Sequence, residues 1–257
     1  MIIVKIAGGL GNQLFCLNKA LEIRQLTNKV YLDLSQYERE RYGRIYHFDN
    51  KLSELKVLKK SIKKFLNKTN KLLTKTKFYN IYEENRNLFN ILNLAKSKKI
   101  FYLSGYWQEE VYPNRYNLTK LQKLFKENKV KDSNIVCVHF RTKEYEIKLD
   151  ISYYKNALKL FDQDYEFHIY GDDINFLNNN IPKLFYKFNY KICNLDDIEA
   201  FEEMMTYKNY ISSNSTYCWW SIILNKNNLG IVTTPEVWMK NKNYNIYRPK
   251  EWKIVHN

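Results

Sequence analysis

Glycine, proline and cysteine are scarce in this 257-residue chain, which has 7 glycines, 4 prolines and 4 cysteines. Few glycines and prolines, together with 22 tyrosines, exclude a collagen-like or low-complexity chain and favour a globular fold. The cysteines form no C-x-x-C pair, which argues against a zinc site. A reducing compartment is the simplest interpretation of so few thiols.

Long apolar runs are also missing. No apolar run approaches the roughly 20 residues that a helix needs to cross a bilayer. The first six residues lack the charged region and cleavage site of a signal peptide. We therefore expect a cytoplasmic protein of bacterial or viral origin.

Acidic residues are outnumbered, with 27 Asp and Glu against 42 Lys and Arg, which gives a formal net charge of +15. Such a charge suits nucleic acid, anionic lipid or phosphorylated substrates, whereas a solvated lysine surface arising from compositional bias is the plainer alternative. No RRM, KH, zinc-finger or helix-turn-helix signature is present. We expect no specific nucleic-acid partner, and a basic nucleic-acid-binding protein is a remote alternative.

Residues 50–77 combine ten lysines with apolar residues at helical spacing, which predicts a basic amphipathic helix. Such a helix can bury one face on its own domain, or it can make a peripheral contact with an anionic membrane at the inner face.

Strand-like and helix-like segments alternate along the chain, most clearly in its second half, which predicts parallel sheets covered by helices. The expected strands are 1–6, 29–33, 100–103, 135–140, 165–170, 210–212 and 230–233. The expected helices are 14–26, 116–128, 152–161, 197–207 and 217–224. A polar segment at 129–134 places the domain boundary between an N-terminal lobe, 1–132, and a C-terminal lobe, 133–257.

Three segments join a strand to a polar or glycine-rich turn. The first is GGLGNQ at 8–13, where glycine permits close backbone approach to a ligand, although a tight turn without a ligand is the alternative. The second is HFRTKEY at 139–145, at a strand end where open α/β sheets bind ligands. Arg141 could hold a phosphate there or pair with Glu144. The third is SNSTYCWW at 213–220, whose hydroxyl and amide residues could cap a helix or leave backbone N–H groups for an anion.

With GYWQ at 105–108 and YGDD at 170–173, these motifs stand in the order seen in glycosyltransferase family 11, the α-1,2-fucosyltransferases, and the resemblance spans roughly the whole chain. It implies an α/β, GT-B-like fold of two Rossmann-like lobes with a cleft between them. The implied reaction is inverting transfer of L-fucose from GDP-β-L-fucose to the 2-hydroxyl of a terminal β-galactoside. The implied partners are a GDP-sugar donor, bound by the C-terminal lobe, and a glycan acceptor.

The resemblance also implies roles for individual residues. The expected donor-binding residues are Gly9, Gly11, Asn12, Gln13, His139, Arg141, Asp172, Asn214, Ser215 and Thr216. The expected acceptor-binding residues are Tyr106, Trp107 and Gln108. The expected catalytic residues are Arg141, Glu144 and Asn12, with Glu144 as the first candidate for the general base and Glu109 and Glu110 as the second. Alternatives stay open: His139 as a hydrogen-bonded strand-end residue, Asp172 as a turn residue, and Tyr106 and Trp107 as core.

Stabilising the leaving diphosphate requires a divalent metal or fixed cationic and N–H groups. Metal-dependent transferases usually carry Asp-x-Asp, whereas the acidic pairs at 172–173 and 196–197 are adjacent residues. We therefore expect no metal and no cofactor, with Arg141, Ser215 and Thr216 holding the diphosphate.

The middle motif departs from the family's usual His-x-Arg-Arg-Gly-Asp-Tyr. Thr142 replaces the second arginine, and Lys143, in place of the glycine, could restore the charge but not the planar fork. A related transferase with a different GDP-sugar or acceptor is therefore an alternative.

Overall fold

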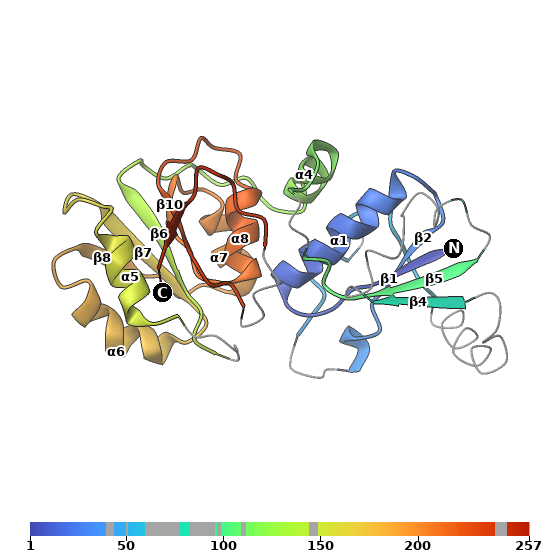
Figure 1. Ribbon diagram of the computed structural model, residues 1–257, viewed down its shortest axis with the longest axis horizontal. Helices are drawn as coiled ribbons and strands as arrows, with labels where there is room; N and C mark the ends of the chain where they lie inside the picture. The colour runs from blue at the N-terminus through green and yellow to red at the C-terminus, as the bar shows by residue number, and fades with distance from the viewer. Residues whose placement is uncertain are drawn as a thin grey trace. The chain divides into compact units, whose positions relative to one another are not determined.

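The computed structural model describes residues 1–39, 44–49, 51–59, 78–82, 96, 99–108, 112–143, 149–239 and 246–256 (Figure 1). The chain divides into two compact units. The first comprises Met1–Gln108 and Pro113–Leu124, and the second comprises Glu109–Tyr112 and Phe125–Asn257.

The first unit contains a parallel sheet with the strand order β3-β2-β1-β5-β4. Its strands are β1 (Ile2–Lys5), β2 (Val30–Asp33), β3 (Lys56–Val57), β4 (Phe78–Tyr82) and β5 (Ile100–Ser104). Its helices include α1 (Leu10–Arg24), α4 (Arg115–Gln122) and the short 3-10 helix Tyr37–Arg39. The sequence of β1 is almost wholly apolar because this central strand is buried by neighbours on both sides. The chain crosses from one side of β1 to the other before β5, so β1 and β5 form a topological switch point.

The second unit contains a parallel sheet with the order β11-β10-β9-β6-β7-β8. Its strands are β6 (Ile135–Phe140), β7 (Glu166–Gly171), β8 (Asn189–Ile192), β9 (Asn209–Ile211), β10 (Val232–Pro235) and β11 (Lys253–Val255). Its helices are α5 (Ile151–Leu158), α6 (Ile174–Leu184), α7 (Asp197–Met204) and α8 (Thr216–Ile223). Counted from β6, the order is 3-2-1-4-5-6 read from β8 to β11, which is the Rossmann order with its switch point between β6 and β9.

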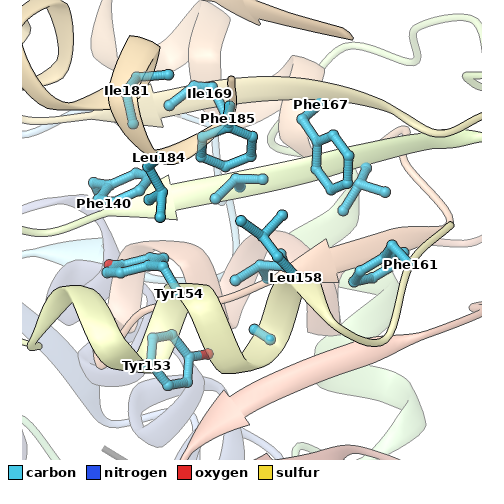
Figure 2. Packing of buried hydrophobic residues seen from close by; sticks show 14 of the residues in the cluster. Phe140, Tyr153, Tyr154, Leu158, Phe161, Phe167, Ile169, Ile181, Leu184 and Phe185 are labelled. Atoms are coloured by element: carbon cyan, nitrogen blue, oxygen red, sulfur yellow. The ribbon is translucent and has the colours of Figure 1, made fainter. Parts of the chain in front are cut away.

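Aromatic side chains fill the space between this sheet and helices α5 and α6 (Figure 2). Phe140, the last residue of β6, stacks on Tyr154 of α5 with ring centroids 3.9 Å apart and planes inclined by 16°. Phe167 packs edge-on against Phe185 at 5.3 Å. Because the last residue of β6 is held in this core, the residues that follow it begin from a fixed position.

The prediction of two Rossmann-like α/β units is confirmed. The units divide between Leu124 and Phe125, whereas the sequence placed the boundary at 132/133. The difference arises because Phe125 packs on Phe201 at 4.6 Å and the backbone N–H of Lys126 donates to Glu202 Oε1 at 2.8 Å. The segment that begins at Phe125 therefore packs with the second unit.

The predicted basic helix is wrong for the part of residues 50–77 that is described. Residues 56 and 57 form β3, which pairs with β2, and the N–H of Leu58 donates to the carbonyl of Leu32 at 2.8 Å. The apolar residues Leu52, Leu55 and Leu58 are buried, but on a segment that extends the sheet. Residues 50 and 60–77 lie outside the described part, so the proposed membrane contact stays a prediction. Within the described residues, no helix is both long and apolar enough to span a bilayer.

Candidate functional site

The carboxyl ends of β6 and β9 meet at the switch point of the second sheet, where a buried histidine joins them. His139 Nδ1 lies 2.7 Å from Ser213 Oγ, and the hydroxyl of Tyr154 donates to the carbonyl of His139 at 3.2 Å. Burial lowers the pKa of His139 to about 4; the nearby Asp172 opposes this shift and Arg141 adds to it. The imidazole is therefore neutral at pH 7 and can serve as a hydrogen-bonding group but not as a cation.

Arg141 follows directly after β6 and is held by an acidic residue from the end of β7. Its Nε lies 3.3 Å from Asp172 Oδ2, with about a quarter of each side chain exposed. Asp172 Oδ1 also accepts hydrogen bonds from the N–H of Thr142 at 2.8 Å and from the Thr142 hydroxyl at 2.9 Å. The structure therefore joins the middle motif to the YGDD segment. Glu144, the alternative partner of Arg141, lies outside the described residues.

Helix α8 begins beside this cluster without a side-chain cap among the described residues. Ser215 occupies the N-cap position, but its side chain makes no capping hydrogen bond, contrary to one interpretation of the sequence. Its Oγ is buried and has no hydrogen-bond partner among the described residues. The positive end of the α8 dipole and a buried hydroxyl thus lie at the carboxyl end of β9, which is an arrangement suited to an anion.

Two buried tryptophans hold helix α8 in place. The rings of Trp219 and Trp220 are fully buried and perpendicular, with centroids 5.0 Å apart. Trp219 Nε1 donates to the carbonyl of Tyr247 at 2.7 Å. Asn214, which precedes the helix, donates from Nδ2 to the carbonyl of Trp238 at 3.3 Å. These contacts fix the start of the helix, and the contribution of Trp238 could not be predicted from the sequence.

The first unit brings together the GGLGNQ and GYWQ motifs at its own switch point. Gln108 Nε2 donates to Asn12 Oδ1 at 2.9 Å, which joins the segment after β5 to the first turn of α1. Gly8 has a φ of +78°, and a Cβ there would lie 2.7 Å from Asn12 Nδ2 and 3.1 Å from the Tyr106 ring. Gly8 is therefore required for the close approach of these two motifs.

Helix α1 begins at Leu10, earlier than the sequence suggested, so Gly11, Asn12 and Gln13 lie in its first turn and Gly9 is its N-cap. Gln13 is completely buried. Its Nε2 donates to the carbonyls of Gly8 and Ile45 at 3.2 and 2.8 Å, and its Oε1 accepts from the N–H of His47 at 3.2 Å. This side chain holds the loop at 44–49, and the expected donor contact of Gln13 stays a prediction.

The predicted acceptor residues differ in exposure. Tyr106 is 38% exposed, whereas Trp107 and Gln108 are buried. Trp107 adopts a left-handed φ of 56°, and Lys19 Nζ lies 5.8 Å from its ring centroid. Tyr106 is therefore the aromatic residue of this motif with surface available for stacking on a sugar.

The predicted residues form two groups, one in each unit. The second unit holds His139, Arg141, Asp172, Asn214, Ser215 and Thr216 at neighbouring strand ends, and the first holds Gly9, Gly11, Asn12, Gln13, Tyr106, Trp107 and Gln108. Glu109, Glu110 and Glu144 lie outside the described residues. Sequence reasoning missed the pairing of Ser213 with His139, although Ser213 begins the third motif.

The described residues include no group of three or more His, Cys, Asp and Glu side chains placed to hold a metal ion. One Asp-x-Asp spacing occurs in the sequence, at Asp162-Gln163-Asp164. It lies in the exposed turn between α5 and β7, at the amino end of β7 and thus at the sheet edge opposite to Arg141 and Ser215. This spacing therefore lies apart from Arg141 and Ser215, the residues expected to hold the donor diphosphate.

Both units are parallel α/β units, and the second has the Rossmann strand order, with polar groups and an arginine at its switch point. Open α/β sheets of this kind bind their ligands at such a point. The family model of glycosyl transferase family 11 matches residues 1–255, and the chain belongs to this family. It is 22% identical to an alpha-1,2-colitosyltransferase of Escherichia coli, over 97% of this chain and 96% of that one. It is 24% identical to the O-antigen biosynthesis glycosyltransferase WbnK of Escherichia coli, over 96% of this chain and 98% of that one.

Two solved structures show a weaker similarity. The glycosyl transferase family 9 protein of Veillonella parvula DSM 2008 aligns with a TM-score of 0.45 and 8% identity, over 99% of this chain and 86% of that one. TarM aligns with a TM-score of 0.36 and 17% identity, over 95% and 48%. The fold assignment rests on the strand order of the two sheets.

Replacing Gly8 by alanine should destabilise the first unit, because the left-handed φ costs an L-residue about 1–2 kcal/mol and the new Cβ would displace Asn12. The matched control is Gly9→Ala, where a Cβ meets nothing within 4 Å. Urea unfolding of both variants measures the difference. Equal midpoints for the two would show that the approach of GGLGNQ to GYWQ does not depend on Gly8.

His139 should make the protein less stable in mild acid. Its folded pKa of about 4 lies below the unfolded value of 6.5, so the unfolded chain binds more protons between these values and stability falls as the pH drops. From pH 7 to pH 5 this group should remove about 2 kcal/mol. The free energy of unfolding of His139→Gln, measured in urea at the two pH values, should fall less than that of the wild type. His256→Gln, a control at a mostly exposed imidazole, should retain the wild-type fall.

Proposed function

We propose that this chain is an inverting glycosyltransferase that moves L-fucose from GDP-β-L-fucose to the 2-hydroxyl of a terminal β-galactoside. The observation that carries the proposal is the grouping of Arg141, His139 and Ser215 at the carboxyl ends of β6 and β9. A guanidinium, a neutral imidazole and a helix start whose hydroxyl has no partner among the described residues are groups that can bind a nucleoside diphosphate. Family membership supplies the class of reaction.

The donor diphosphate would be held by Arg141 together with the first turn of α8. As the sugar–phosphate bond breaks, negative charge grows on the leaving diphosphate, and fixed positive groups stabilise that charge without reorganising. This arrangement can act without a divalent ion. We therefore propose a metal-independent reaction.

Inversion requires one displacement, so no enzyme nucleophile takes part. The acceptor hydroxyl attacks the anomeric carbon, loses its proton and expels GDP. We retain Glu144 as the proposed base because it takes the acidic position of the middle motif, and Asn12 as a residue that orients the reacting groups. Tyr106, the exposed aromatic residue of the first-unit group, is the proposed stacking surface for the acceptor sugar.

Two specific observations favour a colitosyl donor as an alternative to the fucosyl donor. The relative at 22% identity is named an alpha-1,2-colitosyltransferase, and Thr142 and Lys143 depart from the usual motif. A colitosyl donor differs from a fucosyl donor in the sugar and not in the reaction. Transfer assays with both donors on one β-galactoside acceptor distinguish these two versions of the proposal.

Guanine nucleotides should stabilise the protein selectively. GDP or GDP-fucose at about 100 times its Kd adds about 2.7 kcal/mol of stability, which raises the melting temperature by several degrees. UDP and CDP should have little effect, and EDTA should change none of these shifts. Arg141→Ala should remove the shift, whereas Arg115→Ala, at an exposed position on α4, should preserve it. A full GDP shift in the Arg141 variant contradicts the proposed site.

Ser215→Ala separates function from folding. An N-cap serine normally contributes about 1 kcal/mol through its capping bond, but this side chain makes none among the described residues. We therefore expect unchanged stability in urea with a severalfold weaker binding of GDP by calorimetry. The control is Asp196→Ala, which should lose about 1 kcal/mol because Asp196 caps α7 through the N–H groups of Ile198 and Glu199. Unchanged GDP affinity in Ser215→Ala would place the diphosphate elsewhere.

A further inference from the structure

Asp172 directs its carboxylate to the strand end that follows β6. Oδ2 pairs with Arg141 Nε at 3.3 Å, and Oδ1 accepts from the N–H and the hydroxyl of Thr142 at 2.8 and 2.9 Å. The N–H of Lys143 lies 3.3 Å from Oδ1 and 3.2 Å from Oδ2. One side chain from the end of β7 thus contacts three consecutive residues of the middle motif.

The next residue, Asp173, has a separate role. Its Oδ1 accepts from the N–H groups of Asn175 and Phe176 at 3.1 Å each, so it caps α6. The two adjacent aspartates therefore have different roles. Asp173 caps α6, whereas Asp172 contacts the residues that follow β6.

Gly171 allows this contact to form. It pairs in register with Phe140, and a Cβ at Gly171 would lie 3.1 Å from the carbonyl oxygen of Phe140 and 3.2 Å from its Cβ. The ends of β6 and β7 are therefore packed closely just before Arg141 and Asp172. A side chain at position 171 would push the two residues apart.

We propose that Asp172 is a positioning residue that acts through Arg141 and does not itself contact the nucleotide. This inference rests on the proposed function of Arg141. The ion pair places the carboxylate beside Arg141 Nε without a hydrogen bond between them, and the hydrogen bonds to residues 142 and 143 hold the backbone that follows Arg141. An arginine oriented before binding loses less conformational freedom when it binds a diphosphate. Thr142, which stands where the family usually has a second arginine, contributes its hydroxyl to this support.

A double-mutant cycle tests the proposal with GDP as the probe and its Kd measured by calorimetry. We expect Arg141→Ala to weaken binding at least tenfold and Asp172→Asn to weaken it about fivefold to tenfold. The variant with both changes should bind no more weakly than Arg141→Ala alone, because a residue that acts through Arg141 has nothing left to support. Asp173→Asn is the matched control and should keep the wild-type Kd, because asparagine also caps helices.

The outcomes separate the two claims. If Arg141→Ala leaves the Kd unchanged, the proposed function of the site fails. If Arg141→Ala weakens binding but Asp172→Asn does not, the positioning role fails alone. A further full loss in the double variant would place Asp172 on the nucleotide and also overturn the role. Thr142→Val, which removes only the hydroxyl bond, tests the same role if Asp172→Asn does not fold: it should weaken GDP binding twofold to threefold, and only when Arg141 is present.

Discussion

The parallel pairing of β6 with β9 is the constraint on which the proposed donor site depends. These strands are neighbours in the sheet although more than sixty residues separate them, and Val138 pairs with Ile211 in register. His139 follows Val138 directly and Ser213 lies two residues after Ile211, and the contact of His139 with Ser213 joins the two strand ends. A register shift of one residue would turn these side chains to the opposite face of the sheet.

Each unit gathers polar residues at the carboxyl ends of its central strands, but the residue types differ. In the second unit, charged and hydroxyl groups gather where β6, β7 and β9 end. In the first, glycine and amides gather where β1 and β5 end, joined by Asn12 and Gln108. Both groups lie at switch points because helices that leave a sheet in opposite directions leave room for ligands between their starts. Residues at such edges are positioned by the core beneath the sheet, as the stacking of Phe140 on Tyr154 holds the end of β6.

Central strands and their motifs could be predicted from the sequence because burial makes them continuous apolar runs, as at 135–140. Helix α6 was missed because it contains asparagines and Pro182, and strand β8 was missed because this edge strand is mostly exposed. The segment at 51–59 repeats leucine every three residues, which mimics a helix, whereas the structure has turns at 51–55 and the short strand β3 at 56–57, which pairs with β2. The contacts of Asp172 with residues 141–143 could not be predicted, since sequence carries no signal for which of two adjacent aspartates turns to a neighbouring strand.

The perpendicular pair Trp219 and Trp220 has a spectroscopic consequence. All five tryptophans are buried, so the folded protein should emit at short wavelength and shift to the red on unfolding. Two of the indoles lie in α8, a few residues after Ser215 at the start of the helix. Trp219 and Trp220 therefore lie within a few residues of the proposed anion site, and their fluorescence should respond to an anion that binds there.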